Sequence, residues 1–316
     1  MSFYKKKFKK PKFWNNNKPN FLAKLLLPFT LILMINNFIL NLKKKVKFSQ
    51  IKSICVGNIY LGGSGKTPLT IKLYNILSNM NIKTVTAKKD YKDQLDEQII
   101  LKKKAKLILA TDRLLALKKA VEDSNDVIIF DDGLQDNKID YDLKIVCFKI
   151  KNWIGNGYLL PAGPLREKIN SLKKYDAVFL NGRINPAKNI EKIINKINPK
   201  IKIFYTSYEA INLENFNREK EYLIFSGIGE PQDFKEILIE NNFKISKEVT
   251  FPDHYNYSQN DIENIINQAN KINSEIITTE KDYVKLSEVH KKSINFLQIN
   301  LKIYDDENLK KILTAH

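Results

Sequence analysis

The sequence predicts an α/β protein in which a parallel sheet is covered by helices. A smaller α/β unit follows this sheet, and an apolar helix precedes it. Three observations support the prediction. From about residue 50 onward, short apolar runs alternate with helical stretches, as in sheets that are buried on both faces. A glycine-rich turn separates the first apolar run from the first helical stretch. One uncharged apolar segment lies between lysines near the start of the sequence.

These patterns divide the 316 residues into three parts. We expect a basic and apolar membrane-anchoring segment over residues 1–48, a first α/β domain over residues 49–200 and a second α/β unit over residues 201–316. Residues 181–200 are the expected linker region between the last two parts.

The first part combines apolar residues with a local excess of positive charge. Residues 25–42 carry no charge, and lysines flank them on both sides. The formal net charge of +18 arises within the first 89 residues, which hold 18 lysines and no acid, whereas the rest of the chain is neutral. Such a distribution favours an anionic membrane surface over a nucleic acid. We favour a helix that lies in the membrane interface, with a spanning helix and a buried helix as alternatives.

The second and third parts are read as alternating strands and helices. In the first domain we expect strands at 51–58, 82–87, 126–132, 143–149 and 175–181, with helices at 67–80 and 113–124. In the second unit we expect strands at 202–207, 221–229, 243–251 and 274–282, followed by a short last strand, with helices at 231–242 and 258–271. Continuous apolar strands joined by helices indicate a parallel arrangement.

The turn after the first strand resembles a phosphate-binding loop. It reads "LGGSGKTP" over residues 61–68, although the common pattern places a further glycine where Tyr60 stands. Backbone N–H groups of the loop would surround a phosphate, and the following helix N-terminus would add partial positive charge. Lys66 would reach the β- and γ-phosphates, and the Thr67 hydroxyl would hold Mg²⁺. The glycines of this predicted P-loop are Gly62, Gly63 and Gly65. A purely structural glycine turn is the alternative.

Further polar residues occur at the ends of strands and in loops. Asp131 and Asp132 end the strand "DVIIFDD", and beside a phosphate loop they are candidate metal ligands. The segment "GNGYLLPAGPLRE" at 155–167 carries Arg166, whose planar guanidinium suits a phosphate; a structural Arg–Glu salt bridge is the alternative. His254 stands in "FPDHYNYS", where a surface position is more plausible than a function from the residues alone.

Taken in order along the chain, these pieces resemble the tetraacyldisaccharide 4'-kinase family, the lipid A kinases of Gram-negative bacteria. The resemblance covers nearly the whole chain: "FW…LLLP", "VGNIYLGGSGKTP", "DDGLQ", "GNGYLLPAGPLRE", "SGIGEPQDF", "FPDHY" and "TTEKD". The family's loop also lacks the early glycine, so Tyr60 at that position is consistent with membership of the family. The resemblance implies Mg²⁺-dependent transfer of the γ-phosphate of ATP to the 4'-hydroxyl of a tetraacyldisaccharide 1-phosphate, which gives lipid IVA. The enzyme would act at the cytoplasmic face of the bacterial inner membrane, without an obligate protein partner and without nucleic acid.

The resemblance also assigns residues to the site. It implies nucleotide contacts from Ser64, Arg113 and Gln135 in addition to the glycines, Lys66, Thr67 and Arg166. It adds Glu167 to Thr67, Asp131 and Asp132 as a metal ligand. The family's base is an aspartate in a "GDEP"-like motif, paired with the histidine of "DHY". The nearest match here is "LDEQ", which makes Asp96 the base and His254 its partner.

Three departures from the family pattern concern the acceptor side. The family's "RGY" appears as Lys89-Asp90-Tyr91, the segment before "LDEQ" is shortened, and Lys149 stands where an acid is expected. A divergent member with reduced activity is therefore one alternative. Another is a membrane-associated P-loop ATPase that switches a protein partner, although such proteins carry a signature lysine where Leu61 stands. A nucleic-acid-dependent ATPase is disfavoured by the neutral charge beyond residue 89.

Overall fold

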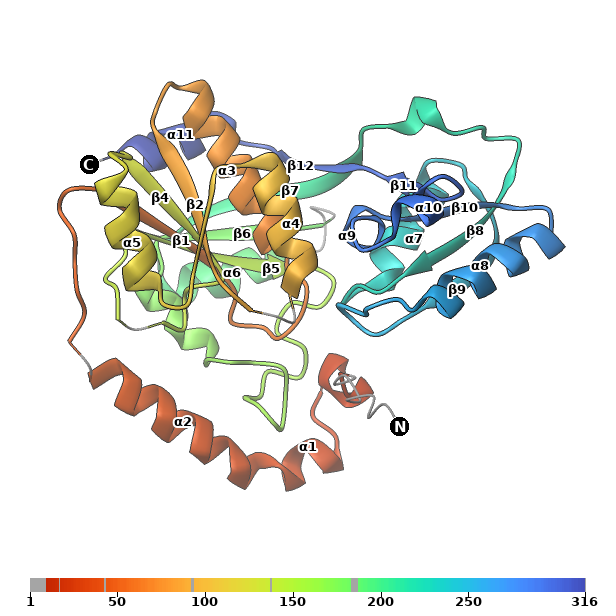
Figure 1. Cartoon of the computed structure of the whole chain (residues 1–316). Helices are drawn as coiled ribbons and strands as arrows, with labels where there is room; N and C mark the ends of the chain where they lie inside the picture. Colours follow the sequence, from red (N-terminus) through yellow and green to blue (C-terminus); the bar gives the residue numbers. More distant parts are fainter. Residues whose placement is uncertain are drawn as a thin grey trace. The chain divides into compact units, whose positions relative to one another are not determined.

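The protein forms two compact units, which we describe separately using a computed structural model (Figure 1). The structure describes residues 10–16, 18–42, 44–91, 94–136, 138–182 and 187–315. The large unit comprises Lys10–Asp90, Leu101–Ser207 and Leu301–His316. The described part of the small unit falls within Tyr91–Ile100 and Tyr208–Asn300. The chain therefore contributes more than one segment to each unit.

An eight-stranded sheet forms the centre of the large unit, with the strand order β12-β7-β6-β5-β1-β4-β2-β3. Every pairing from β7 to β3 along this order is parallel, which confirms the predicted parallel sheet. The strands are β1 (Lys52–Gly57), β2 (Thr84–Lys89), β3 (Leu107–Ala110), β4 (Val127–Asp131), β5 (Leu143–Lys149), β6 (Ala177–Asn181), β7 (Lys202–Ala210) and β12 (Ile299–Ile303). The first strand, β1, lies between β4 and β5, so the segments that follow β1 and β4 start side by side.

Helices cover this sheet because its strands are apolar on both sides. One apolar cluster joins α5 and α6 to residues of β4 such as Ile128 and Phe130. Helix α3 packs against β1, β2 and β4 and buries Leu69, Leu73 and Leu77, which are not part of that cluster. The remaining helical elements of this part of the chain are short or lie at its ends. The bounds are α3 (Lys66–Asn79), α5 (Arg113–Glu122), η3 (Ile169–Lys174), α6 (Ala187–Ile197) and α11 (Asp306–Thr314). Helix α4 (Leu95–Lys104) is divided between the units: its residues up to Ile100 belong to the small unit and the rest to the large unit.

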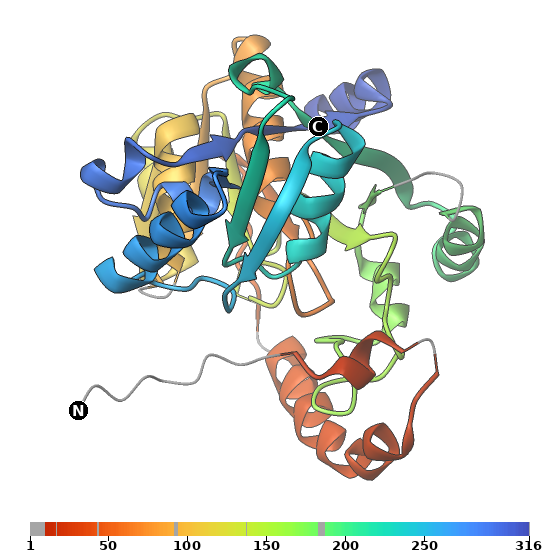
Figure 2. The same cartoon turned by 90° about the vertical axis from the view of Figure 1, so that its right-hand side faces the viewer.

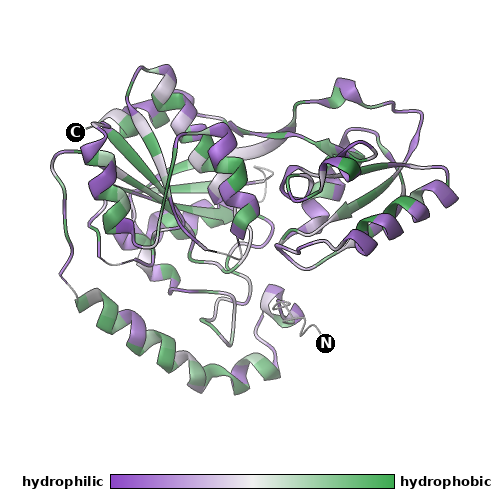
Figure 3. Cartoon of the chain, viewed as in Figure 1, coloured by the Kyte–Doolittle hydropathy of each residue, from purple (hydrophilic) through white to green (hydrophobic). Residues whose placement is uncertain are grey.

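The N-terminal part of the large unit contains η1 (Lys12–Asn15), α1 (Phe21–Leu25) and α2 (Leu27–Leu42). Leu26 ends α1, and Pro28 falls in the first turn of α2, where a missing backbone N–H costs no helical hydrogen bond. Large apolar side chains of α2 are exposed, among them Ile32 at 69% and Phe38 at 65%. Figure 3 shows α2 coloured mainly as hydrophobic. In the part of the chain that the structure describes, no helix is both long and apolar enough to cross a bilayer.

The short helix η1 is anchored on the loop that follows β5. The Trp14 indole N–H donates to the Pro161 carbonyl at 3.1 Å, and the Trp14 carbonyl accepts from the Asn156 N–H at 2.9 Å. Gly155 makes this contact feasible, because it has a φ of +58° and a Cβ there would lie 2.2 Å from the Trp14 carbonyl oxygen. The "FW" and "GNG" motifs of the sequence therefore contact each other.

The small unit is built on a four-stranded parallel sheet with the order β11-β10-β8-β9. Phe234 and Leu238 of α7 pack with Tyr222 and Ile224 of β8, whereas α8 packs on the alternate residues of that strand. The two helices therefore cover opposite faces, as Figure 2 shows. The elements are η4 (Leu213–Asn215), β8 (Glu221–Ser226), α7 (Pro231–Glu240), β9 (Lys244–Thr250), α8 (Gln259–Lys271), β10 (Glu275–Thr279), α9 (Glu280–Tyr283), α10 (Glu288–Lys291) and β11 (Asn295–Leu297).

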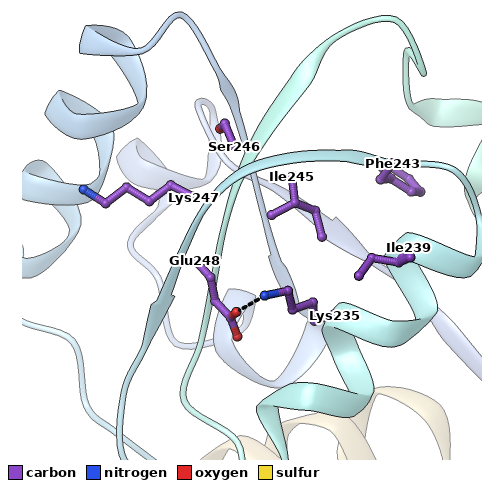
Figure 4. A pocket seen from close by; sticks show the side chains of 7 residues that line it. All are labelled: Lys235, Ile239, Phe243, Ile245, Ser246, Lys247 and Glu248. Carbon is purple, nitrogen blue, oxygen red and sulfur yellow. Dashed lines mark hydrogen bonds and ion pairs between the residues drawn. The ribbon is translucent and has the colours of Figure 1, made fainter.

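A hollow of about 300 Å³ lies beside the edge strand β9 (Figure 4). Lys235 of α7 reaches across to Glu248 of β9, with 2.7 Å between Nζ and Oε2. Phe243 and Ile245 supply apolar lining next to this ion pair. The ion pair links α7 to the edge of the sheet, so this hollow has a structural explanation.

The units differ from the expected division in two places. Residues 181–200 were expected to contain a linker, but α6 occupies most of this stretch and buries Ile190 and Ile194. The expected boundary at residue 200 precedes β7, which pairs with β6 in the sheet of the large unit. In addition, residues 91–100 belong to the small unit although the large unit surrounds them in sequence, and residues from 301 onward return to the large unit.

Candidate active site

Parallel pairing brings the ends of β1 and β4 together. Val56 of β1 pairs with Asp131 of β4, so the chain leaves both strands at the same edge of the sheet. The glycine loop (residues 58–65) follows β1 and leads directly into α3, which begins at Lys66. This is the strand, turn and helix context that a phosphate-binding loop requires.

Two of the three glycines of the loop, Gly62 and Gly65, are placed where other residues would be strained. Gly62 has a φ of +138°, and Gly65 has a φ of +85° at the N-cap of α3. The Asn58 side chain holds the turn together by donating to the Gly62 carbonyl at 3.0 Å and to the Ser64 hydroxyl at 2.8 Å. The loop is thus preformed, and it presents the N-terminus of α3 to an anion.

Tyr60 explains why this loop does without the early glycine. Its backbone forms an antiparallel bridge with Leu165, and the neighbouring Leu61 N–H donates to the Pro164 carbonyl at 2.8 Å. The Tyr60 side chain is buried against Leu159 and Leu165. The entrance of the loop is extended chain paired with the 155–167 segment, so its backbone needs no left-handed residue here.

Thr67, Asp131 and Lys88 meet at the base of the loop. The Thr67 hydroxyl donates to Asp131 Oδ2 at 2.8 Å, and Lys88 Nζ donates to the same oxygen at 2.8 Å. The side chains of Lys88 and Asp131 are 1% and 0% exposed. The other carboxylate oxygen, Asp131 Oδ1, is buried and has no hydrogen-bond partner among the described residues.

Asp132 lies one residue further along, between two cations. Lys66 Nζ is 3.8 Å from Asp132 Oδ2, and an Arg166 guanidinium nitrogen is 3.3 Å from Asp132 Oδ1. Asp132 has a φ of +60°, a backbone conformation that aspartate adopts more readily than most residues. The backbone therefore turns sharply after β4, and the carboxylate lies between Lys66 and Arg166.

Gln135 and Glu167 extend this network. Gln135 accepts from Arg166 at 3.1 Å and donates to the Asn58 carbonyl at 2.9 Å. Glu167 accepts from the Tyr175 hydroxyl at 3.0 Å and pairs with Lys174 at 2.6 Å. The family resemblance implies that Glu167 is a metal ligand, whereas in this structure Lys174 balances its charge.

Arg113 is buried at the start of α5, where its guanidinium is bound within the protein. It donates to the Asp136 carboxylate at 3.0 Å and to the backbone carbonyl of Asp132. Arg113 thus supports the turn after β4.

Asp96 and His254 come together in the small unit, although 158 residues separate them. His254 Nδ1 lies 2.8 Å from Asp96 Oδ1 and 2.9 Å from Oδ2. Asp96 lies in the first turn of α4, and its side chain is 2% exposed, whereas that of His254 is 20% exposed. His254 has a φ of +54°, and its N–H donates to the Gly227 carbonyl at 3.0 Å.

The pKa of Asp96 lies below its usual value. Burial by itself would raise this pKa, but the hydrogen bond from His254 and the positive charge of Lys281 together lower it. The carboxylate is therefore held in its ionised form, which can accept a proton.

Residues at the base of the glycine loop fit a magnesium ion. Mg²⁺ needs only one or two protein oxygens when a nucleotide supplies the others. The unpartnered Oδ1 of Asp131 and the Thr67 hydroxyl beside it offer such ligands. Among the described residues, no three acidic, histidine or cysteine side chains lie close enough together to bind a metal ion by themselves.

Two residues of these networks had no role in the sequence reasoning. Lys88 was hidden in a lysine-rich stretch, and only its place in the buried strand β2 could have indicated it. Asp282, in "TTEKD", is fully buried and accepts from the Gly227 N–H at 3.0 Å, so it supports the backbone that holds His254.

Comparison with known proteins identifies the family. A sequence model of the tetraacyldisaccharide-1-P 4'-kinase family (LpxK) matches residues 20–316. The chain belongs to this family. A tetraacyldisaccharide 4'-kinase of Pelagibacter ubique (strain HTCC1062) is 49% identical over 305 residues, which cover 96% of each chain. The same enzyme of Rickettsia canadensis (strain McKiel) is 36% identical over 312 residues, or 93% of each chain. The protein is therefore a kinase.

A solved structure of the same family supports the fold. It is the "apo" form of LpxK from Aquifex aeolicus in complex with ATP, and it matches with a TM-score of 0.70 at 26% identity. The match covers 92% of this chain and 98% of that chain. The α/β, P-loop-like fold that the sequence predicts is thus shared with a member of the LpxK family.

Proposed function

We propose that this LpxK family member transfers the γ-phosphate of ATP to the 4'-hydroxyl of a tetraacyldisaccharide 1-phosphate, giving lipid IVA. The observation that carries the proposal is the arrangement at the glycine loop. Lys66 and the N-terminus of α3 supply positive charge, and Asp131 has one buried carboxylate oxygen without a partner among the described residues. Phosphoryl transfer depends mainly on such positioning and charge neutralisation.

In this proposal the large unit binds the nucleotide. Backbone N–H groups of Gly62, Gly63, Ser64 and Gly65 bind the phosphates, and Lys66 neutralises the transferred group. Arg166 and Gln135 contribute hydrogen bonds to the nucleotide, and Arg113 acts by supporting the turn after β4. Thr67 and Asp131 would hold Mg²⁺, with Asp132 next to them. When bound, this ion would neutralise charge on the β- and γ-phosphates.

Asp96 acts as the general base, and His254 supports it. The 4'-hydroxyl oxygen forms a bond to the γ-phosphorus as the bond to the bridging oxygen breaks, and ADP leaves with that electron pair. The hydroxyl proton passes to Asp96, which His254 orients through Nδ1. The lowered pKa of Asp96 keeps the carboxylate ionised, so it holds no proton before the acceptor hydroxyl binds.

The apolar surface of α2 supports contact with the cytoplasmic face of the inner membrane. Ten large apolar side chains of α1 and α2 are more than half exposed, and lysines flank these helices in sequence. A hollow of about 610 Å³, almost entirely apolar, lies between α2 and the loop after β5. Its lining is Leu26, Phe29, Ile32, Leu33, Asn36, Leu160 and Pro161. An acyl chain of the substrate or of a lipid has the chemistry to fill it.

The first test is transfer of labelled phosphate from ATP to tetraacyldisaccharide 1-phosphate in detergent micelles with Mg²⁺. We expect label in the lipid with the wild type. Lys66→Ala should lower the transfer rate by a factor of about 10³ or more, because it removes the charge that stabilises the transferred group.

Lys72→Ala is the matched control, because Lys72 lies on the same helix, α3, one and a half turns further along. It should transfer phosphate at the wild-type rate. ATP hydrolysis without label in the lipid would contradict the proposed acceptor and would favour an ATPase that switches a partner.

A further inference from the structure

Four charged side chains of the small unit lie together around His254. Asp96 and Glu97 come from the first turn of α4, Asp253 precedes His254 in its loop, and Lys281 comes from α9. His254 Nδ1 is bound by Asp96, as described above. His254 Nε2 lies 3.8 Å from Asp253 Oδ1 and 4.0 Å from Glu97 Oε1, which is too far for a hydrogen bond to either.

Lys281 binds an acid that lies next to His254 Nε2. Lys281 Nζ is 2.5 Å from Glu97 Oε1, the same oxygen that lies 4.0 Å from His254 Nε2. Glu97 is 14% exposed and Lys281 28% exposed, so water screens this ion pair only in part. Lys281 and the imidazole therefore share one carboxylate oxygen of Glu97 as a neighbour, Lys281 in contact with it and His254 Nε2 4.0 Å away.

We propose that Lys281 is a positioning residue for the Asp96–His254 pair: by binding Glu97, it keeps that carboxylate from His254 Nε2 and so keeps the pair free of an extra proton. The inference rests on the proposed function, in which Asp96 accepts the proton of the acceptor hydroxyl. Without Lys281, Glu97 would stabilise a charged imidazolium between two carboxylates. A pair that already holds that proton is a weaker base.

The charges around the pair support this role. Lys281 is among the groups that lower the pKa of Asp96, after the hydrogen bond from His254. Burial acts against the charge of Lys281 itself, but Glu97, Asp96 and Asp253 together raise its pKa, so it stays protonated. Among the described residues, Tyr255, Tyr257, Asp282 and Lys285 are further ionisable groups near the pair. Lys285 pairs with Asp282, whereas Lys281 contacts Glu97, an acid next to the imidazole.

The test follows the imidazole signals of the full chain by NMR as the pH is changed. The chain has only three histidines, so His254 can be assigned by comparison with His254→Gln. The signals report the titration of the coupled pair and not of one residue. Lys281→Met should raise the midpoint by about one pH unit, because it removes a cation and releases an anion. Lys281→Arg should restore the wild-type midpoint.

Two further variants separate this role from a merely structural one. Glu97→Gln should lower the midpoint, and Lys281→Met/Glu97→Gln should return it close to the wild-type value, because both charges are then gone. Lys291→Met is the matched control, since Lys291 also pairs with a neighbouring acid, Glu288, in the small unit. It should leave the signals of His254 unchanged. If Lys281→Met does not fold, Glu97→Gln alone tests whether the charge of Glu97 acts on the Asp96–His254 pair.

Kinase assays separate failure of the inference from failure of the proposed base. With Lys281→Met, the acidic limb of kcat/KM against pH should move to higher pH by the same amount as the NMR midpoint. An unchanged midpoint in Lys281→Met, or an equal shift in Lys291→Met, would overturn the inference. Full activity of Asp96→Asn would instead overturn the proposed base, whatever the NMR midpoints show.

Discussion

Lys88 and Asp131 form an ion pair that is almost completely removed from water. Burying two charges is costly, and their attraction offsets this cost only when the geometry is good and further hydrogen bonds are present. Here the Thr67 hydroxyl supplies a further hydrogen bond to the shared oxygen. Lys88 therefore balances the charge of Asp131 at the base of the glycine loop when no metal ion is there to do so.

We expect Lys88→Met to lower the free energy of unfolding by about 3–5 kcal/mol, because Asp131 would remain as a buried charge with no cation. Thermal unfolding without nucleotide measures the loss. The double variant Lys88→Met/Asp131→Asn should regain most of it, since neither charge then remains. If the double variant is as unstable as the single one, the loss comes from packing and not from charge.

At the residue scale, the sequence predicted most of the residues that the structure brings together at the glycine loop. Thr67, Asp131 and Asp132 could be predicted because they follow parallel strands that end at one edge of the sheet. The Asp96–His254 contact was predicted only through the family resemblance, and the structure brings the two side chains within 2.8 Å. Lys88 and Lys281 were missed, because in a lysine-rich chain the residue type does not distinguish a buried lysine from a surface one.

Helix α2 is the element whose surface differs most from that of a soluble protein. Its apolar side chains are exposed along most of its length, and its inner side packs Leu33 and Met34 against the cluster of Tyr60, Leu159 and Leu165. Asn37 also donates to the Arg166 carbonyl at 3.0 Å. The helix is thus fixed to the large unit by one side while the other remains apolar and uncovered.

We expect Phe38→Asp to weaken binding to vesicles of anionic phospholipid by about tenfold or more, because burial of a large apolar side chain contributes about 1.5–3 kcal/mol. Flotation of the protein with the vesicles measures binding. Ile193→Asp is the matched control, since Ile193 is an exposed apolar residue of α6. Equal loss in both variants would indicate that α2 is not the membrane-binding surface.

At the element scale, the elements missed from the sequence were short or polar. Helix α4 contains "LDEQ" and ends in three lysines, and among so many charged residues its few apolar residues do not stand out as a helical pattern that would have predicted it. Helix α6 lies within residues 181–200, where a linker is expected from the sequence. Its residues Ile190 and Ile194 nevertheless repeat at a helical spacing and are buried. Strand β3 has only four residues, too few for a period to be recognised.

At the scale of the whole molecule, the two proposed halves of the chemistry belong to different units. Nucleotide binding is assigned to the large unit and proton acceptance to the small unit. We therefore expect Asp96→Ala to lower the transfer rate by a factor of about 10² or more while ATP binding remains close to the wild-type value. Isothermal titration with ATP measures the binding, and lipid phosphorylation measures the rate.

His254→Ala should give a similar loss of rate, and Asp96→Ala/His254→Ala should be little worse than either variant, because residues that act as a unit are not additive. His290→Ala is the control, because His290 lies in α10, is half-buried like His254 and has no proposed role. Independent, additive losses from Asp96 and His254 would contradict their proposed action as a pair.

The division of the chain could be predicted only in part at this scale. The sequence indicates two α/β parts, because the alternation of strands and helices continues beyond residue 200. It does not reveal that residues 91–100 and 208–300 share a unit, since that depends on contacts between distant side chains such as Asp96 and His254. Periodicity reports local structure and carries no information on such pairing.

The position of β12 has a consequence for synthesis of the protein. This strand lies next to β7 at the edge of the eight-stranded sheet, but the ribosome makes it only after β8, β9, β10 and β11. Until then the backbone N–H and C=O groups along one side of β7 are unpaired, and an open strand edge of this kind is a template for wrong association. The nascent chain must therefore emerge almost to its last helix, α11, before this edge is closed, and a chaperone that shields β7 during that interval would raise the yield of folded protein.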